Sequence, residues 1–110
     1  MDVTAELLGR FEIFHDLQPA VLDRLAPLAV PRRIPRGGEL FSAGEARRAC
    51  FLIVGGHVEV RVDRGGSSGP VVVLGPGETV GEAALLEPGI HAATARAVDE
   101  LEVLVLDAEA

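Results

Sequence analysis

The residues whose types and spacing could do chemistry lie at positions 81–97, which read GEAALLEPGIHAATARA. Gly81 lets a ligand approach the backbone, and the free N–H groups of a helix that starts beside it favour a phosphate. Glu82 does not suit a phosphate, but its carboxylate can accept hydrogen bonds from the vicinal hydroxyls of a sugar. An acceptor beside an anion site predicts a ribose phosphate. A glutamate that satisfies the dipole of an ordinary helix is the simpler explanation of the same few residues.

Two kinds of element surround this segment along the chain. Residues 1–29 carry apolar side chains at helical spacing, and three- and four-residue steps predict a helix over residues 19–29, with an irregular last turn at Pro27. From Val30 onward, short apolar or alternating runs are separated by glycine turns, which is typical of a β-sandwich or barrel. A short helix over residues 82–86 interrupts the predicted strands, and the chain has the length of one domain.

Three stretches carry the clearest strand patterns. Residues 50–54 are continuously apolar, which indicates a buried strand. Residues 57–63 alternate between polar side chains and valine, which places one face of a strand against a core. Residues 101–106 are apolar at most positions, so we expect both faces of the last strand to be covered. Between them, the glycine- and serine-rich residues 64–70 predict a loose hairpin loop.

The composition limits the classes of partner. The net charge is −7, so the field of the whole chain does not attract nucleic acid or an anionic membrane, and an anion site must be built locally. Cys50 is the only cysteine, which excludes an intrachain disulfide, and its apolar neighbours predict a buried, inert thiol. The N-terminus lacks a signal-peptide pattern, and no apolar run approaches the roughly 18 residues of a membrane span, so we expect a cytoplasmic protein.

The order and spacing of five blocks resemble the cyclic nucleotide-binding domain family. These blocks are FEIFHDLQPAVLDRLAPLA, RGGELFSAGE, FLIVGGHVEV, VVVLGPGETVGEAALLEPGIHAATARA and LEVLVLD. The resemblance implies a mainly-β fold, an eight-stranded β-roll of jelly-roll type with N-terminal helices, as in catabolite activators and protein kinase regulatory subunits. It also implies binding of cyclic AMP or cyclic GMP, and residues 81–97 look like the phosphate-binding cassette of the family.

The resemblance assigns a role to several residues of that segment. Gly81 matches the family glycine whose backbone meets the phosphate, and Glu82 matches the glutamate that binds the ribose 2′-hydroxyl. Ala83 and Ala84 match positions whose backbone N–H groups face the cyclic phosphate. Ala92 stands where a hydroxyl side chain favours cyclic GMP in some branches, which implies cyclic AMP as the ligand, with cyclic GMP second.

His91 departs from the family pattern, because it occupies the position of an arginine that pairs with the phosphate. Arginine offers a permanent charge and a fork of donors, whereas a neutral histidine offers one donor and no charge. A hydrogen bond to a charged group contributes about 1.5–3 kcal/mol, so its loss weakens binding roughly 10- to 150-fold. The unperturbed pKa of imidazole is about 6.5, so protonation could restore part of the attraction in mildly acidic solution.

Three arginines could replace the missing cation. Arg96 is an odd number of positions from His91, so on a continuous strand the two side chains face opposite sides. We therefore expect Arg96 to be a solvated surface charge. Arg47 and Arg48 lie in a loop whose direction the sequence does not fix, so their assignment as the phosphate cation is less certain from sequence.

Other classes of function have less support. His57 and Glu59 form an H-x-E pair on one strand face, but no second cluster completes a metal site. No serine or cysteine nucleophile has a base near it in sequence, so we expect no catalytic residue and no enzymatic activity. The sequence predicts a regulatory ligand-sensing module with a phosphate site weakened by His91. A structural or protein-interaction β-roll that binds no nucleotide is the alternative, and a cupin-like metal protein is the third hypothesis.

We expect a single domain over residues 1–110, with residues 1–29 helical and residues 30–107 forming the β-roll. The family usually continues into helices that close over the base and carry the response to an effector. The sequence stops just after the last predicted strand, so we expect a portion of a longer protein or a minimal module whose lid comes from elsewhere. The expected partners are a cyclic nucleotide or another small anion, with an effector domain or a second copy of the chain.

Overall fold

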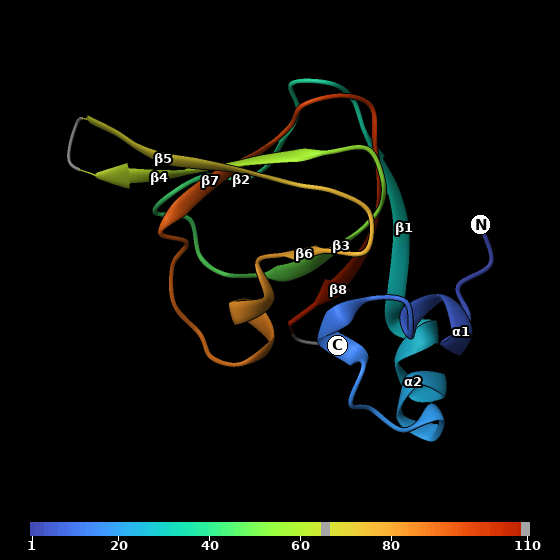
Figure 1. Ribbon diagram of the computed structural model, residues 1–110. Coiled ribbons are helices and arrows are strands. Elements are labelled where there is room, and N and C mark those ends of the chain that lie inside the picture. The colour runs from blue at the N-terminus through green and yellow to red at the C-terminus, as the bar shows by residue number, and fades with distance from the viewer. Residues whose placement is uncertain (65–66, 109–110) are drawn as a thin grey trace.

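The computed structural model describes residues 1–64 and 67–108, which form eight strands in two four-stranded sheets. The strands are β1 (Ala29–Ile34), β2 (Glu39–Phe41), β3 (Ala49–Gly55), β4 (Val58–Arg64), β5 (Ser67–Leu74), β6 (Thr79–Val80), β7 (Ala93–Ala97) and β8 (Leu101–Asp107). One sheet has the order β1-β8-β3-β6 and the other β2-β7-β4-β5, with every neighbouring pair antiparallel. Figure 1 shows the two sheets as the layers of a roll. The predicted mainly-β, eight-stranded fold is confirmed.

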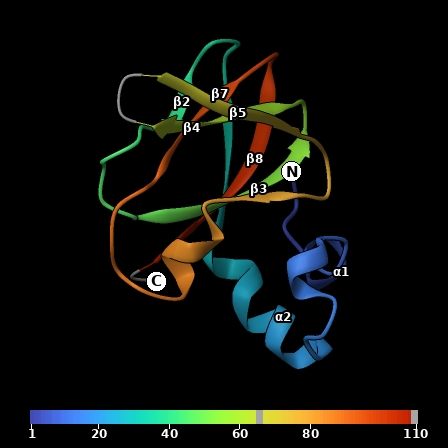
Figure 2. The same cartoon turned by 60° about the vertical axis from the view of Figure 1, so that its left-hand side comes forward.

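Residues 1–28 form four short helices that lie at one end of the roll (Figure 2). They are α1 (Ala5–Leu8), η1 (Glu12–Phe14), α2 (Pro19–Leu25) and η2 (Ala26–Leu28), where η denotes a 3₁₀ helix. Pro19 begins α2 because the fixed φ of proline suits the first helical turn. The helix predicted over residues 19–29 is α-helical only to Leu25, because Pro27 lacks the N–H that would continue it.

The sheet that contains β3 is covered on both faces, which explains the continuous apolar run of this strand. Cys50 and Leu52 pack with the helices, whereas Phe51 and Ile53 pack with the second sheet. The strand β8 divides in the same way, since Leu104 and Leu106 join the helical cluster and the remaining buried side chains of the strand join the other. The prediction that both faces of the last strand are covered is confirmed.

The second sheet has one buried and one solvated face. Val58 of β4 is fully buried between the sheets, while Glu59 and Arg61 of the same strand form an ion pair with Nη2 and Oε1 at 2.9 Å on the outer side. The alternation predicted for residues 57–63 is therefore confirmed, and its polar face carries charges. Such alternation is the expected pattern for an antiparallel sheet with one side in water.

Two local predictions differ from the structure. The helix expected over residues 82–86 is the single 3₁₀ turn η3 (Glu82–Leu85), because Pro88 and Gly89 follow too closely for an α-helix to develop. The loop expected over residues 64–70 is shorter, since β4 runs to Arg64 and β5 begins at Ser67; residues 65–66 lie outside the described part. Continued backbone pairing between Arg64 and Ser67 satisfies hydrogen bonds that a longer loop would leave to water.

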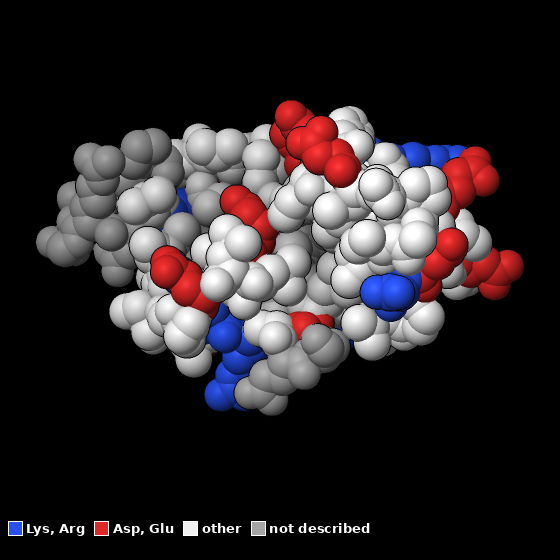
Figure 3. Space-filling model, turned by 90° about the horizontal axis from the view of Figure 1, so that it is seen from below, with Lys and Arg blue, Asp and Glu red and all other residues white. Residues whose placement is uncertain are grey.

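The surface around the N-terminal helices and η3 is viewed from below in Figure 3. Acidic groups are spread over this face, and basic groups form small separate patches rather than one continuous basic surface. This distribution agrees with the net charge of −7. Among the described residues, no helix has both the length and the apolar character needed to cross a membrane.

Candidate ligand-binding site

The chain turns sharply at Gly81, between β6 and η3. Gly81 has a φ of 77°, in the left-handed region that favours glycine. A Cβ atom at this position would lie 3.2 Å from both the carbonyl oxygen of Ala49 and the ring of Phe41. Backbone conformation and close packing thus both require glycine here. This turn fixes where η3, and with it Glu82, begins relative to β2 and β3.

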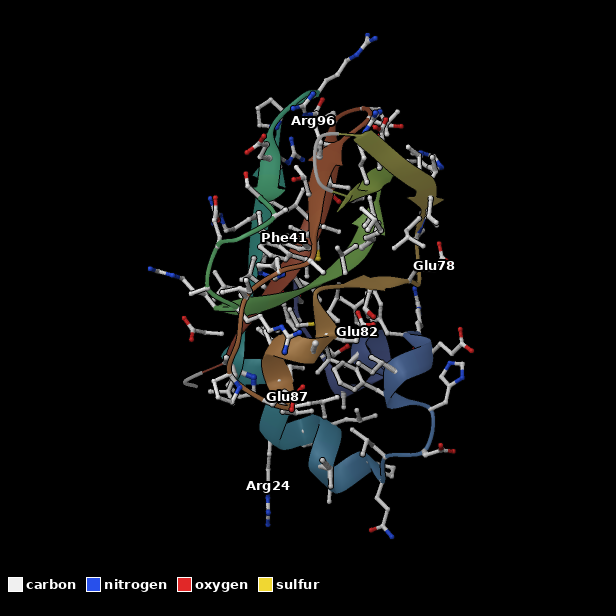
Figure 4. All side chains as sticks on the ribbon, turned by 90° about the vertical axis from the view of Figure 1, so that its left-hand side faces the viewer. Arg24, Phe41, Glu78, Glu82, Glu87 and Arg96 are labelled. Carbon is white, nitrogen blue, oxygen red and sulfur yellow. The ribbon has the colours of Figure 1, made fainter. Side chains whose placement is uncertain are left out.

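Both ends of the segment 81–92, which we call the cassette, line a cavity of about 450 Å³. Apolar side chains of β4 and β5 form the facing wall, among them Val60 and Leu74. The polar side chains at the cavity include those of Glu82 and His91. Figure 4 shows Glu82 and Glu87 projecting from the cassette region, with Phe41 on the strand above them. A cavity of this volume with a mainly apolar lining and few polar groups is typical of a small-molecule site.

The structure brings together most of the residues that the sequence predicts for the site. Those that line the cavity are Gly81, Glu82, Ala83, His91 and Ala92. Ala84 is the exception, because its side chain is buried and its N–H donates to the carbonyl oxygen of Gly81 at 3.1 Å. The predicted contact of that N–H with a phosphate would require this hydrogen bond to break.

His91 lies buried against Phe41. The two rings are stacked, with centroids 3.6 Å apart and an interplanar angle of 9°. The residue is 8% exposed, and no other described residue forms a hydrogen bond with its ring. Burial lowers the pKa of His91, the positive charge of Arg47 lowers it further, and Glu45 acts in the opposite direction. The imidazole is therefore neutral at neutral pH, and its surroundings oppose the charging in mild acid that the sequence suggested.

Arg47 reaches the same cavity from the loop between β2 and β3. Its guanidinium passes over Gly89, where a Cβ atom would lie 3.0 Å from Nη1. Nη1 also lies 3.6 Å from Oε1 of Glu87, and the Arg47 side chain is 22% exposed. One of the two weaker candidates from the sequence thus lies at the site. Arg48 does not line this cavity but a smaller neighbouring hollow, together with Asp107 and Arg47 itself.

Arg96 lies elsewhere, on the outer face of the second sheet. It pairs with Glu39, with Nη2 and Oε1 3.4 Å apart, and its side chain is 58% exposed. Figure 4 shows Arg96 near the end of the sheet that is remote from Glu82. The prediction that Arg96 is a solvated surface charge is confirmed, and the carboxylate of Glu39 accounts for its position.

The side chains that the sequence suggested for a metal site or a reactive thiol have other surroundings in the structure. Nδ1 of His57 lies 2.8 Å from Oδ2 of Asp99, whereas Glu59 pairs with Arg61, so the H-x-E pair does not converge. The described residues contain no group of three or more His, Cys, Asp or Glu side chains that could hold a metal ion. Cys50 is fully buried as predicted, and burial, followed by the charge of Glu82, raises the pKa of its thiol to about 12.

Comparison with known proteins decides the family. The family model for the cyclic nucleotide-binding domain matches residues 31–110. The chain belongs to this family. It is similar to the cyclic AMP receptor protein of Thermus thermophilus, with 36% identity over 95 residues that cover 86% of this chain and 44% of that protein. A CRP-like cAMP-activated global transcriptional regulator of Mycobacterium tuberculosis is 27% identical over 106 residues, 96% of this chain and 47% of that protein.

The fold of this cyclic nucleotide-binding domain recurs among solved structures. A cyclic nucleotide-binding-like protein from Brucella abortus superposes with a TM-score of 0.80 and 27% identity, over 96% of this chain and 90% of that one. The chain spans less than half the length of the two curated relatives. In fold and sequence it is a domain of the cyclic nucleotide-binding type.

Proposed function

We propose that the chain binds a cyclic nucleotide in the cavity beside the cassette and acts as a ligand-sensing domain without enzymatic activity. The observation that carries this proposal is the convergence of Gly81, Glu82 and Ala83 on one wall of a cavity whose other wall is apolar. The exposed carboxylate of Glu82 suits ribose hydroxyls, and the turn at Gly81 suits a phosphate. The apolar side chains of β4 and β5 suit a purine base.

The proposed phosphate interaction at position 91 is weaker than an arginine would provide. His91 is neutral and stacked on Phe41, so it offers at most one uncharged donor. Ala92, which lines the cavity without a hydroxyl group, favours cyclic AMP over cyclic GMP in this proposal. Because the curated relatives are about twice as long, we propose that an effector domain or a second copy of the chain receives the signal.

One observation favours a second function. His91 is 8% exposed and its ring is packed on Phe41, so the family position for the phosphate cation is filled by a side chain that behaves as part of the core. A β-roll of this kind could act as a structural or protein-interaction domain that binds no nucleotide.

Calorimetric titration separates the two functions. Cyclic AMP and cyclic GMP are added to the wild-type chain and to His91→Arg, which restores the family residue. We expect the wild type to bind cyclic AMP in preference to cyclic GMP, and His91→Arg to bind it more tightly. If neither protein binds either nucleotide, the structural alternative holds.

A further inference from the structure

We infer that Arg47, from the loop between β2 and β3, supplies the positive charge that holds the phosphate of a cyclic nucleotide in this chain. The inference rests on the proposed function and names the residue on which its anion site depends. His91 occupies the position at which the family places this charge, but its ring packs on Phe41. Arg47 lines the same cavity as His91 and Gly81, and its charge is permanent.

Backbone hydrogen bonds fix the position of Arg47. The loop that carries it pairs with the cassette as a short antiparallel ladder, in which the N–H of His91 donates to the carbonyl oxygen of Glu45 and the N–H of Arg47 donates to that of Gly89, both at 2.8 Å. A bridge between Ala46 and Ile90 lies between these two bonds. The ladder places Arg47 two positions from the residue opposite His91, on the same side of the pairing. The proximity of Arg47 to the site is therefore set by the main chain.

Gly89 has no side chain, which leaves space for the guanidinium of Arg47. A Cβ atom at this position would lie 3.0 Å from Nη1 and 3.3 Å from Cζ of Arg47. Any other residue would require the guanidinium to shift by a few tenths of an ångström from the cassette backbone. The absence of a side chain at position 89 thus lets Arg47 lie against the segment that the proposed function assigns to the phosphate.

Glu87 holds Arg47 only loosely. The distance of 3.6 Å between Nη1 and Oε1 exceeds hydrogen-bond length, and within the described part of the chain the guanidinium forms no hydrogen bond. Glu87 is 73% exposed, so water can replace its contact with Arg47, whereas Arg47 is 22% exposed and its attraction for an anion is less screened. A phosphate would accept short charge-assisted hydrogen bonds from the guanidinium N–H groups of Arg47 and displace Glu87.

The lowered pKa of His91 agrees with this arrangement. After burial, the charge of Arg47 is the largest cause of this shift, which agrees with the position of both residues at one cavity. Glu45 has the opposite effect on this pKa, and Glu82 contributes a carboxylate to the lining of the cavity.

The test compares cyclic AMP with adenosine, which shares the base and the ribose but lacks the phosphate. Calorimetric titrations are run on the wild type, Arg47→Gln, Glu87→Gln and the control Arg48→Gln, which removes a neighbouring charge that does not line the cavity. We expect Arg47→Gln to weaken cyclic AMP binding roughly 10- to 150-fold and to leave adenosine binding unchanged. Arg48→Gln should change neither. Glu87→Gln should strengthen cyclic AMP binding, a gain that a folding defect cannot produce.

The outcomes separate the inference from the proposed function. If the wild type binds cyclic AMP and Arg47→Gln binds it equally well, the inference is overturned and the proposed function stands. If Arg48→Gln weakens binding as much as Arg47→Gln, a general charge effect replaces the specific contact and the inference is also overturned. If neither the wild type nor His91→Arg binds a cyclic nucleotide, the proposed function fails, and the inference fails with it.

Discussion

Arg47 and Arg96 show how differently two arginines of one small domain can be placed. Arg96 is close to His91 along the chain but lies on the outer face of the second sheet, 58% exposed and paired with Glu39. Arg47 is remote in sequence but lines the same cavity as His91 and is 22% exposed. Arg96 is placed by the face of the strand on which it lies. Arg47 is placed by the pairing of its loop with the cassette. Distance along the sequence predicts neither.

The difference in exposure has an energetic consequence. Charges in water are screened by solvent and salt, so the pair formed by Arg96 contributes little to binding or folding. A guanidinium at the wall of a partly apolar cavity is screened less, and an anion nearby gains more from it. The comparison therefore predicts that equal substitutions at the two arginines have unequal effects.

The largest effect on cyclic AMP affinity is expected when the arginine is moved from position 47 to position 91. Arg47→Gln combined with His91→Arg places the charge at the family position and removes it from the loop. Relative to Arg47→Gln alone, we expect the double variant to regain roughly 10-fold or more in cyclic AMP affinity, because a charged donor again faces the phosphate. Calorimetry measures the change. Equal affinities of the two variants would show that an arginine at position 91 does not reach the phosphate.

A smaller loss is expected from Gly89→Ala, because the new methyl group displaces the guanidinium of Arg47. The matched control is Gly37→Ala, since both glycines have positive φ but a Cβ atom at position 37 meets nothing within 4 Å. Both substitutions should cost about 1–3 kcal/mol of folding free energy through backbone strain. Only Gly89→Ala should weaken cyclic AMP binding, measured after thermal denaturation confirms that each variant is folded. Equal losses of affinity in both variants would contradict the contact.

Acidification is expected to have little effect on binding. The pKa of His91 is lowered by burial and by Arg47, so the imidazole gains less charge between about pH 8 and about pH 6 than an unperturbed histidine would. Glu45 would raise this pKa, as would a bound phosphate, but the charge of Arg47 opposes both. The gain in cyclic AMP affinity on acidification, measured by calorimetry, should therefore be small between these pH values. A strong gain at the lower pH that His91→Gln abolishes would make His91 the cation.

The smallest effect is expected at Arg96. Arg96→Gln removes the exposed pair with Glu39 and should leave both cyclic AMP affinity and the melting temperature almost unchanged. A loss of affinity comparable with that of Arg47→Gln would remove the distinction between the two arginines.

The sequence predicts those parts of the structure that depend on the type of side chain at each position. The apolar run of β3 and the alternation of β4 follow directly from which faces are buried. The cassette is predictable because Gly81 and Glu82 keep family residues at family spacing. The pairing of Arg47 with Gly89 uses backbone groups that every non-proline residue has. No pattern of side-chain types in the sequence therefore reveals it. The pKa of His91 depends on Phe41 and Arg47, which only the folded chain brings beside it.

The most direct test of this account is a crystal structure of the wild-type chain with cyclic AMP. The account predicts that the guanidinium of Arg47 lies about 2.7–2.9 Å from a phosphate oxygen and has left Glu87, while His91 remains stacked on Phe41. A bound nucleotide with Arg47 still beside Glu87, and with the phosphate held by the His91 ring, would contradict it.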